Sequence, residues 1–203
     1  MLLGTLAIAP ASSVIVGQGF ARGRTAFQRP LPLPISAMPA GTVMSHRIVD
    51  GLFLATPCRK PASVPAVPKG IRGAKRYGYK YEGAFAAAME QKFPSACMAG
   101  QWFQFNDRNG SGYCQPDLIL RTAKLNIIFE CKLTDVATAR SQLSHLYFPV
   151  VKSALGKPVV GIVVTRHLTK ETMLELVVDT LAQAVARAKE IIPTLHWRER
   201  TPL

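Results

Sequence analysis

The stretch QPDLILRTAKLNIIFECKLT, residues 115–134, limits the fold of this chain more than any other segment. Two apolar runs, 113–120 and 126–133, flank a short polar link, a pattern that predicts two strands joined in a tight hairpin. Both runs nevertheless carry charge. Asp117 lies in the first run, directly before its last three residues, LIL. Glu130 and Lys132 interrupt the second run. Charged side chains in core strands require an explanation.

Strand geometry offers one. Side chains alternate between the two faces of a strand, so Glu130 and Lys132 share a face while Cys131 points into the core on the other. The hairpin link brings Asp117 beside Glu130. Two neighbouring carboxylates repel each other unless a cation lies between them. Oxygen ligands of this kind suit Mg²⁺, and Lys132 can serve an attacking water and the charge on a phosphate. The alternative is two surface ion pairs, Asp117 with Arg121 and Glu130 with Lys132.

The remaining pattern predicts an α/β domain with a mixed sheet of at least four strands, flanked by helices. Pro149 should kink or split the second helix. Thr169 and Thr172 are candidate caps of the last helix, with Glu171 and Glu175 in or near its first turns. The predicted elements are a helix at 81–93, strands at 101–105, 113–120 and 126–133, a helix at 135–155, a strand at 158–165 and a helix at 169–192.

Two polar residues lie on helix faces that should be apolar. Glu82 falls on the stripe of Phe85 and Met89, and Gln142 shares its face with Leu143 and Leu146. A carboxylate or amide on a core-facing stripe needs a partner. One polar site between the helices and the sheet would explain both residues together with the charged strands.

In this order of elements, "QPD" and "ECK" resemble the motifs of the PD-(D/E)xK nuclease family, over about residues 77–168. The resemblance implies a restriction-endonuclease-like core in αβββαβα order. It implies that Asp117 and Glu130 bind the metal, that Lys132 serves the nucleophilic water, and that Glu82 is the first-helix glutamate of many members.

The same resemblance extends to two further residues. The backbone carbonyl of Cys131 is a candidate metal ligand. Gln142 is similar to the second-helix glutamine of exonuclease-like branches, although "QLSHLY" departs from their usual glutamine–tyrosine spacing, so no branch is assigned.

The segment before the domain has a different character. Residues 1–70 hold most of the 15 prolines and predict an extended or disordered basic extension, with the nuclease-like domain at 71–203. The apolar start lacks a basic region and is interrupted by Pro10, which argues against a signal peptide or a membrane span. A secreted or membrane-associated basic protein is the weakest alternative.

A net charge of +13 indicates an anionic partner. The residues expected to contact nucleic-acid phosphates are Arg72, Lys75, Arg76 and Lys80, which lie among tyrosines. A solvated linker is the alternative for this segment. With no C-x-x-C pair a zinc site is not indicated, and four cysteines fit a reducing compartment.

These observations predict a Mg²⁺-dependent deoxyribonuclease, with Mn²⁺ as a substitute metal, that acts in recombination, repair or phage DNA processing. The expected partner is DNA, including branched DNA or free ends, with a homodimer as one expectation from the family. The expected location is the cytoplasm, that of the host if the gene is a phage gene, without stable membrane association. The alternative function is a non-catalytic nucleic-acid-binding module on the same fold. The sequence leaves open exo or endo cleavage and DNA or RNA.

Overall fold

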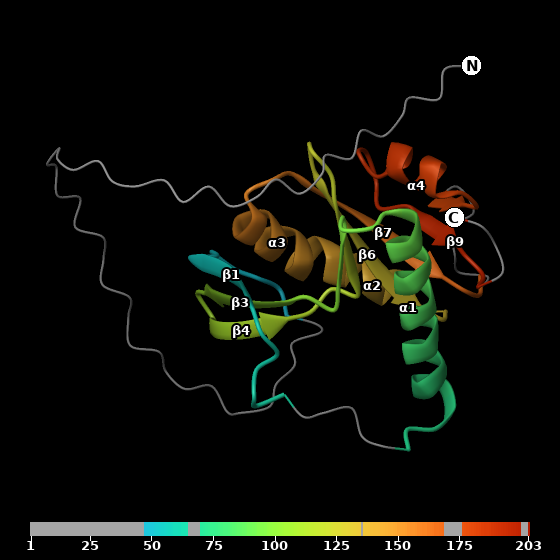
Figure 1. Ribbon diagram of the computed structural model, residues 1–203. Helices are drawn as coiled ribbons and strands as arrows, with labels where there is room; N and C mark the ends of the chain where they lie inside the picture. The colour runs from blue at the N-terminus through green and yellow to red at the C-terminus, as the bar shows by residue number, and fades with distance from the viewer. Residues whose placement is uncertain (1–46, 65–69, 135, 169–175, 200–202) are drawn as a thin grey trace, which may run out of the picture.

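The computed structural model describes residues 47–64, 70–134, 136–168, 176–199 and 203. They form a mixed α/β structure with two sheets, and helices cover both faces of the larger sheet (Figure 1). The predicted α/β class is confirmed. No helix within these ranges combines the length and apolar character needed to cross a membrane.

The larger sheet is mixed and has the strand order β2-β5-β6-β7-β9-β8. The pairs β2–β5 and β5–β6 are antiparallel, whereas β6–β7, β7–β9 and β8–β9 are parallel. The prediction of a mixed sheet with at least four strands is therefore confirmed. Its strands are β2 (Cys97–Ala99), β5 (Leu118–Arg121), β6 (Asn126–Lys132), β7 (Val159–Thr165), β8 (Val177–Val178) and β9 (Thr194–His196).

Alternation along β6 builds two cores, one on each face of the sheet. Phe129 and Cys131 face the helix α1 (Gly73–Lys92), and the rings of Phe129 and Phe85 lie 5.4 Å apart. The helix α4 (Leu181–Arg187) packs on the same face. Ile128 faces the opposite layer, formed by α2 (Val136–Gln142), η1 (Leu143–Tyr147) and α3 (Phe148–Leu155).

A second, smaller sheet has the order β1-β3-β4, with both pairs antiparallel. Its strands are β1 (Leu54–Cys58), β3 (Trp102–Asp107) and β4 (Gly110–Cys114), and it lies against α3. The predicted strand at 101–105 is thus present as β3, but in this sheet. The predicted strand at 113–120 is divided between the two sheets, because the chain turns from β4 to β5 at residues 115–117.

The smaller sheet also recruits part of the predicted extension. β1 lies within 1–70 and pairs along its length with β3. The backbone amide of Val49 donates to the carbonyl of His145 at 3.0 Å. Residues 47–58 therefore pack on the domain, while residues 1–46 and 65–69 lie outside the described part of the chain.

The second predicted helix is interrupted, as expected, but the irregular turn precedes Pro149. Residues Leu143–Tyr147 form a π-helical turn, and α3 resumes at Phe148 with Pro149 near its start. Because proline has no backbone N–H, Pro149 cannot bond the carbonyl of His145. Val49 supplies the missing donor.

The predicted helix at 169–192 is present only in part among the described residues, as α4 (Leu181–Arg187). Val177 and Val178 form the strand β8, and α4 begins only after Thr180, whose side chain accepts from the amide of Gln183 at 3.3 Å. Val177 and Val178 form strand hydrogen bonds with β9, and this tertiary contact overrides the helical period of the sequence. The proposed caps Thr169 and Thr172, with Glu171 and Glu175, lie outside the described residues.

Candidate active site

The hairpin places Asp117 and Glu130 opposite each other. β5 and β6 pair with Leu118 across from Phe129, so the next step of the same register sets Asp117 across from Glu130. The backbone amide of Cys131 donates to Oδ2 of Asp117 at 2.7 Å, which fixes this carboxylate against β6. The predicted shared face is therefore present.

Glu130 and Lys132 form an ion pair with 2.6 Å between Nζ and Oε1. It is not the surface pair of the alternative interpretation, because the Glu130 side chain is 3% exposed. Lys132 is partly open at 27%, so the pair lies at the boundary between core and solvent. Oε2 of Glu130 is buried and has no hydrogen-bond partner. An unpaired buried acceptor typically costs about 1–3 kcal/mol.

Glu82 joins the cluster from α1, in the third turn of that helix, next to its first buried residue, Tyr81. Burial, the charge of Asp117 and the opposing charge of Lys132 set the pKa of Glu82, which rises to about 7. These electrostatic interactions show that α1 brings Glu82 close to both residues. The predicted inward position of Glu82 is confirmed, although its side chain is half-buried.

The pKa values of the two hairpin carboxyls, Asp117 and Glu130, are also raised. Burial raises the pKa of Asp117 to about 6, against the amide of Cys131 and the charge of Lys132. Burial, together with the charge of Asp117, raises the pKa of Glu130 to about 8, against the charge of Lys132. For Lys132 itself, burial lowers the pKa, but the pairing with Glu130 outweighs it and leaves the pKa raised. One lysine does not compensate the burial of three carboxyls.

Gln142 lies in the layer formed by α2, η1 and α3, which covers the face of β6 that carries Glu130. It is buried at the end of α2, and its Oε1 has no hydrogen-bond partner. Tyr147 is buried nearby, and its hydroxyl donates to the carbonyl of Gln115 at 3.3 Å. Burial raises the pKa of Tyr147 well above its ordinary value, with the charges of Glu130 and Asp117 as the next causes.

The sequence pattern places Tyr147 on the same helix face as Gln142, but Tyr147 was not assigned to the site because its spacing from Gln142 departs from the usual one. Residues five apart on an α-helix lie about 140° apart around the axis. In a π turn the bond runs from residue i to i+5, which brings such residues onto one face. The amide of Phe148 bonds the carbonyl of Leu143 in this way. The π turn therefore aligns Gln142 and Tyr147.

The donor set fits a hard divalent cation. Asp117, Glu130 and Glu82 supply carboxylate oxygens, and the unpartnered Oε2 of Glu130 and the raised pKa values both indicate missing positive charge. Within the described ranges, no three His, Cys, Asp or Glu side chains are already arranged as a metal group. Cys131 contributes its amide to Asp117, and its side chain is buried in the core beneath α1.

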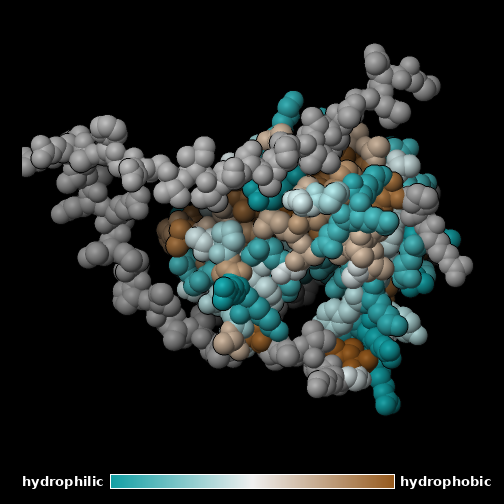
Figure 2. Space-filling model, in the orientation of Figure 1, coloured by the Kyte–Doolittle hydropathy of each residue, from teal (hydrophilic) through white to brown (hydrophobic). Residues whose placement is uncertain are grey.

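The four basic residues expected to contact nucleic acid, Arg72, Lys75, Arg76 and Lys80, are all exposed. They lie at the start of α1, directly before Glu82. Figure 2 shows hydrophilic side chains over this end of the helix, at the lower right of the molecule.

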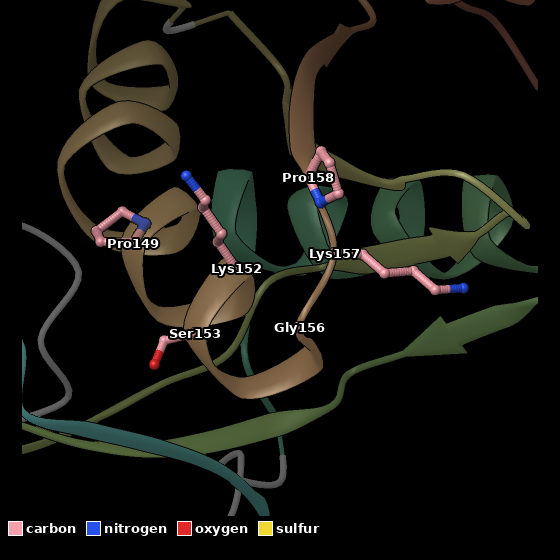
Figure 3. A pocket seen from close by; sticks show the side chains of 6 residues that line it. All are labelled: Pro149, Lys152, Ser153, Gly156, Lys157 and Pro158. Carbon is pink, nitrogen blue, oxygen red and sulfur yellow. The ribbon is translucent and has the colours of Figure 1, made fainter.

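A surface pocket lies elsewhere, at the end of α3 and in the loop to β7 (Figure 3). Lys152, Lys157 and two prolines line it. The loop leads into Val159, which pairs with Asn126 at the far end of β6 from Lys132. The pocket is therefore separate from the carboxylate cluster.

Comparison with known proteins identifies no relative: no family model, no curated protein and no solved structure matches the chain.

Proposed function

We propose that this protein is a metal-dependent nuclease of the PD-(D/E)xK type, with a restriction-endonuclease-like core formed by α1, the hairpin β5–β6, the following helices and β7. One observation carries the proposal. A carboxylate pair, the half-buried Asp117 and the buried Glu130, lies beside a lysine and retains an acceptor, Oε2 of Glu130, without a partner. A structural ion pair has no need of the second carboxylate or of the free oxygen.

In this proposal Asp117 and Glu130 hold Mg²⁺ or Mn²⁺, with the carbonyl of Cys131 as a further ligand and Glu82 at the margin of the site. The bound metal supplies positive charge that polarises a phosphodiester and lowers the pKa of a water molecule. The ammonium group of Lys132, which lies beside Glu130, would orient the attacking water and stabilise charge on the phosphate.

Gln142 and Tyr147 act as positioning residues in this scheme. Gln142 has an acceptor without a partner, and its amide N–H₂ can donate to a carboxylate or to a water held by the metal. Tyr147 anchors the π turn to the carbonyl of Gln115, two residues before Asp117. Together they fix the second layer against the hairpin.

DNA is the proposed substrate, on the basis of charge. The chain carries +13, and the exposed cations Arg72, Lys75, Arg76 and Lys80 lead along α1 to Glu82. Contacts of this kind position the backbone without reading its sequence. Branched DNA and free ends are parts of the proposal that the substrate panel below tests. A homodimer is a further part of the proposal.

A non-catalytic nucleic-acid-binding module is the second candidate. The observation that favours it is the closed contact between Lys132 and Glu130, which neutralises one carboxylate without any metal. In that case the cluster is a buried polar network that fixes the hairpin, and the basic surface alone is functional.

A substrate panel separates the two. Purified protein is incubated with linear, circular and branched DNA, and with single-stranded RNA, in Mg²⁺, Mn²⁺ or EDTA. Cleavage that requires the metal and disappears in Glu130→Gln supports the nuclease. Retardation of the same substrates without cleavage in either metal supports the binding module. Loss of cleavage in EDTA but not in Glu130→Gln indicates a contaminating nuclease.

A further inference from the structure

The first two turns of α1 make little contact with the rest of the described protein. Every residue from Arg72 to Lys80 is exposed except Gly78, whereas Tyr81, Phe85 and Met89 are fully buried. In Figure 1 this end of the helix extends below the sheet. We refer to residues 73–80 as the arm.

The arm is a poor helix by its own composition. It contains Gly73 and Gly78, and glycine costs about 1 kcal/mol relative to alanine inside a helix. No side chain caps its start, and its first turn holds no acidic residue. Lys75 and Arg76 lie where the helix dipole disfavours positive charge. The arm therefore lacks the packing and the local interactions that normally hold a helix together.

One side of the arm is both cationic and aromatic. At 100° per residue, Lys75, Arg76, Tyr79 and Lys80 fall within a stripe about 140° wide. Tyr79 lies near its centre and is 42% exposed. Glu82 follows Lys75 by two turns and lies about 20° from it around the axis, so the stripe runs to the carboxylate site.

Tyr77 provides an internal comparison. Its side chain is 59% exposed, more than that of Tyr79. It lies about 160° around the helix from Tyr79, on the side away from the centre of the stripe. Two tyrosines of similar exposure on one arm therefore differ in the charge around them.

We propose that the stripe binds an unpaired stretch of nucleic acid, with a base stacked on Tyr79 and the flanking phosphates on Lys75, Arg76 and Lys80. A base inside a duplex is covered on both faces by its neighbours, so a single exposed ring favours an unpaired strand. The bound phosphates neutralise the cations that destabilise the arm. Binding and helix formation in the arm are therefore coupled. As a description of the substrate strand, this inference rests on the proposed nuclease function, but the binding itself does not require cleavage.

The first test measures binding in EDTA by fluorescence anisotropy, with a labelled oligothymidine and a duplex of equal length. Tyr79→Leu removes the ring and should weaken single-strand binding about fivefold or more, since stacking of a base contributes on the order of 1–3 kcal/mol. Duplex binding should change less than twofold. Tyr79→Phe retains the ring and should match the wild type, and Tyr77→Leu is the matched control. Equal losses for Tyr79→Leu and Tyr77→Leu, or an equal loss on the duplex, overturn the stacking.

The second test concerns the coupling. A Cβ at Gly78 meets only Oε1 of Glu82, at 3.9 Å, so alanine fits without a clash. If the arm becomes helical on binding, Gly78→Ala should raise single-strand affinity about fivefold, the equivalent of its helix propensity. Gly83 belongs to the part of α1 that packs on the domain, and a Cβ at this position meets no atom within 4 Å. Gly83→Ala should therefore leave affinity unchanged. Unchanged affinity in Gly78→Ala overturns the coupling.

The third test addresses the cations and other anionic partners. Replacing Lys75, Arg76 and Lys80 with Gln should reduce the slope of log affinity against log salt by about 2, at roughly 0.7 per phosphate contact on a single strand. An unchanged slope, or equally Tyr79-dependent binding to vesicles of anionic phospholipid, overturns the assignment to nucleic acid. If the protein cuts no substrate but still binds single strands through Tyr79, this inference stands and the proposed nuclease function is rejected.

Discussion

Two buried acidic residues, Asp107 and Glu130, have opposite surroundings. Asp107 ends β3, and both of its oxygens are bonded: Arg47 pairs with it, and the amides of Asp50 and Asn109 donate at 3.2 and 2.8 Å. Glu130 lies in β6 with one oxygen on Lys132 and the other without a partner. A carboxylate that stabilises a turn is fully bonded within the fold. One that is left partly unbonded indicates a ligand, which is why the site is assigned to Glu130.

The largest expected effect is on catalysis at the incompletely bonded site. Asp117→Asn, Glu130→Gln and Lys132→Ala should each lower the cleavage rate by ~10²–10³-fold or more, because each removes charge that stabilises the transition state. Glu82→Gln should give a milder loss. Single-turnover rates on a labelled DNA substrate measure this. Circular dichroism serves as the control for folding.

Binding should respond differently from cleavage in these variants. Without metal, Asp117→Asn removes negative charge near the phosphates, so its DNA affinity should equal or exceed that of the wild type. Glu130→Gln replaces a carboxyl with a pKa of about 8 and should bind about as well as the wild type near pH 7. Lys132→Ala should bind slightly worse. Wild-type cleavage by both carboxylate variants would remove the distinction between Glu130 and Asp107.

The next effect is on stability at the fully bonded site. Asp107→Ala leaves the guanidinium of Arg47 largely buried without its carboxylate and removes two acceptors for backbone amides. Loss of one partner from a buried pair typically costs about 3–5 kcal/mol. Urea denaturation at pH 7 measures the free energy of unfolding. Glu130→Gln in the same assay should cost far less, and an equal cost would show that both acids serve the fold.

The pH dependence of stability sharpens the contrast. The pKa values of Asp117, Glu82 and Glu130 in the folded protein, about 6, 7 and 8, exceed the ordinary value near 4. Between these limits the folded state binds more protons than the unfolded state. The free energy of unfolding should therefore fall as pH rises from about 4 to 8, by at most about 1.4 kcal/mol per pH unit for each proton.

Denaturation across this pH range in EDTA tests the slope, which Glu130→Gln should reduce. Mg²⁺ or Mn²⁺ should restore stability at pH 8, because a bound cation favours the ionised carboxylates. A flat profile in the wild type would contradict the electrostatic account of the site.

The smallest expected effect concerns the π turn. Deleting Ser144 leaves Gln142 and Tyr147 four residues apart, so an ordinary α-helix aligns them. The fold and the cleavage rate should therefore change little. Deleting the exposed Ala87 from the regular helix α1 is the matched control, and it should unfold the protein because it rotates Met89 away from the stripe of Tyr81 and Phe85. Equal damage from the two deletions would contradict the role of the π turn.

The sequence predicted the parts of the fold that local patterns determine. Alternation fixed the faces of β6, and the short link fixed the hairpin, so Asp117, Glu130 and Lys132 were located correctly. Glu82 and Gln142 were found because polar residues interrupt apolar stripes.

The errors occur where distant contacts decide the structure. Val177 and Val178 fit a helix period, but β9 pairs with them. Tyr147 was not assigned to the site, because its spacing from Gln142 is that of a π turn and not of a regular helix. The strand at 101–105 was expected in the larger sheet, and most of β4 was not predicted, since the pairing of β1 with β3 joins residues about 50 positions apart and leaves no mark on the local pattern.

The contact between α1 and Trp197 has a consequence for the order of folding. The hydroxyl of Tyr81 donates to the carbonyl of Trp197 at 2.9 Å across 116 residues, and the ring of Trp197 lies 5.2 Å from that of Phe85. During synthesis, α1 cannot complete its packing until Trp197 has left the ribosome. Contacts of such separation form late and slowly. Glu82, one residue from Tyr81, is therefore expected to take its place beside the hairpin only then, so that the carboxylate cluster is completed late in synthesis.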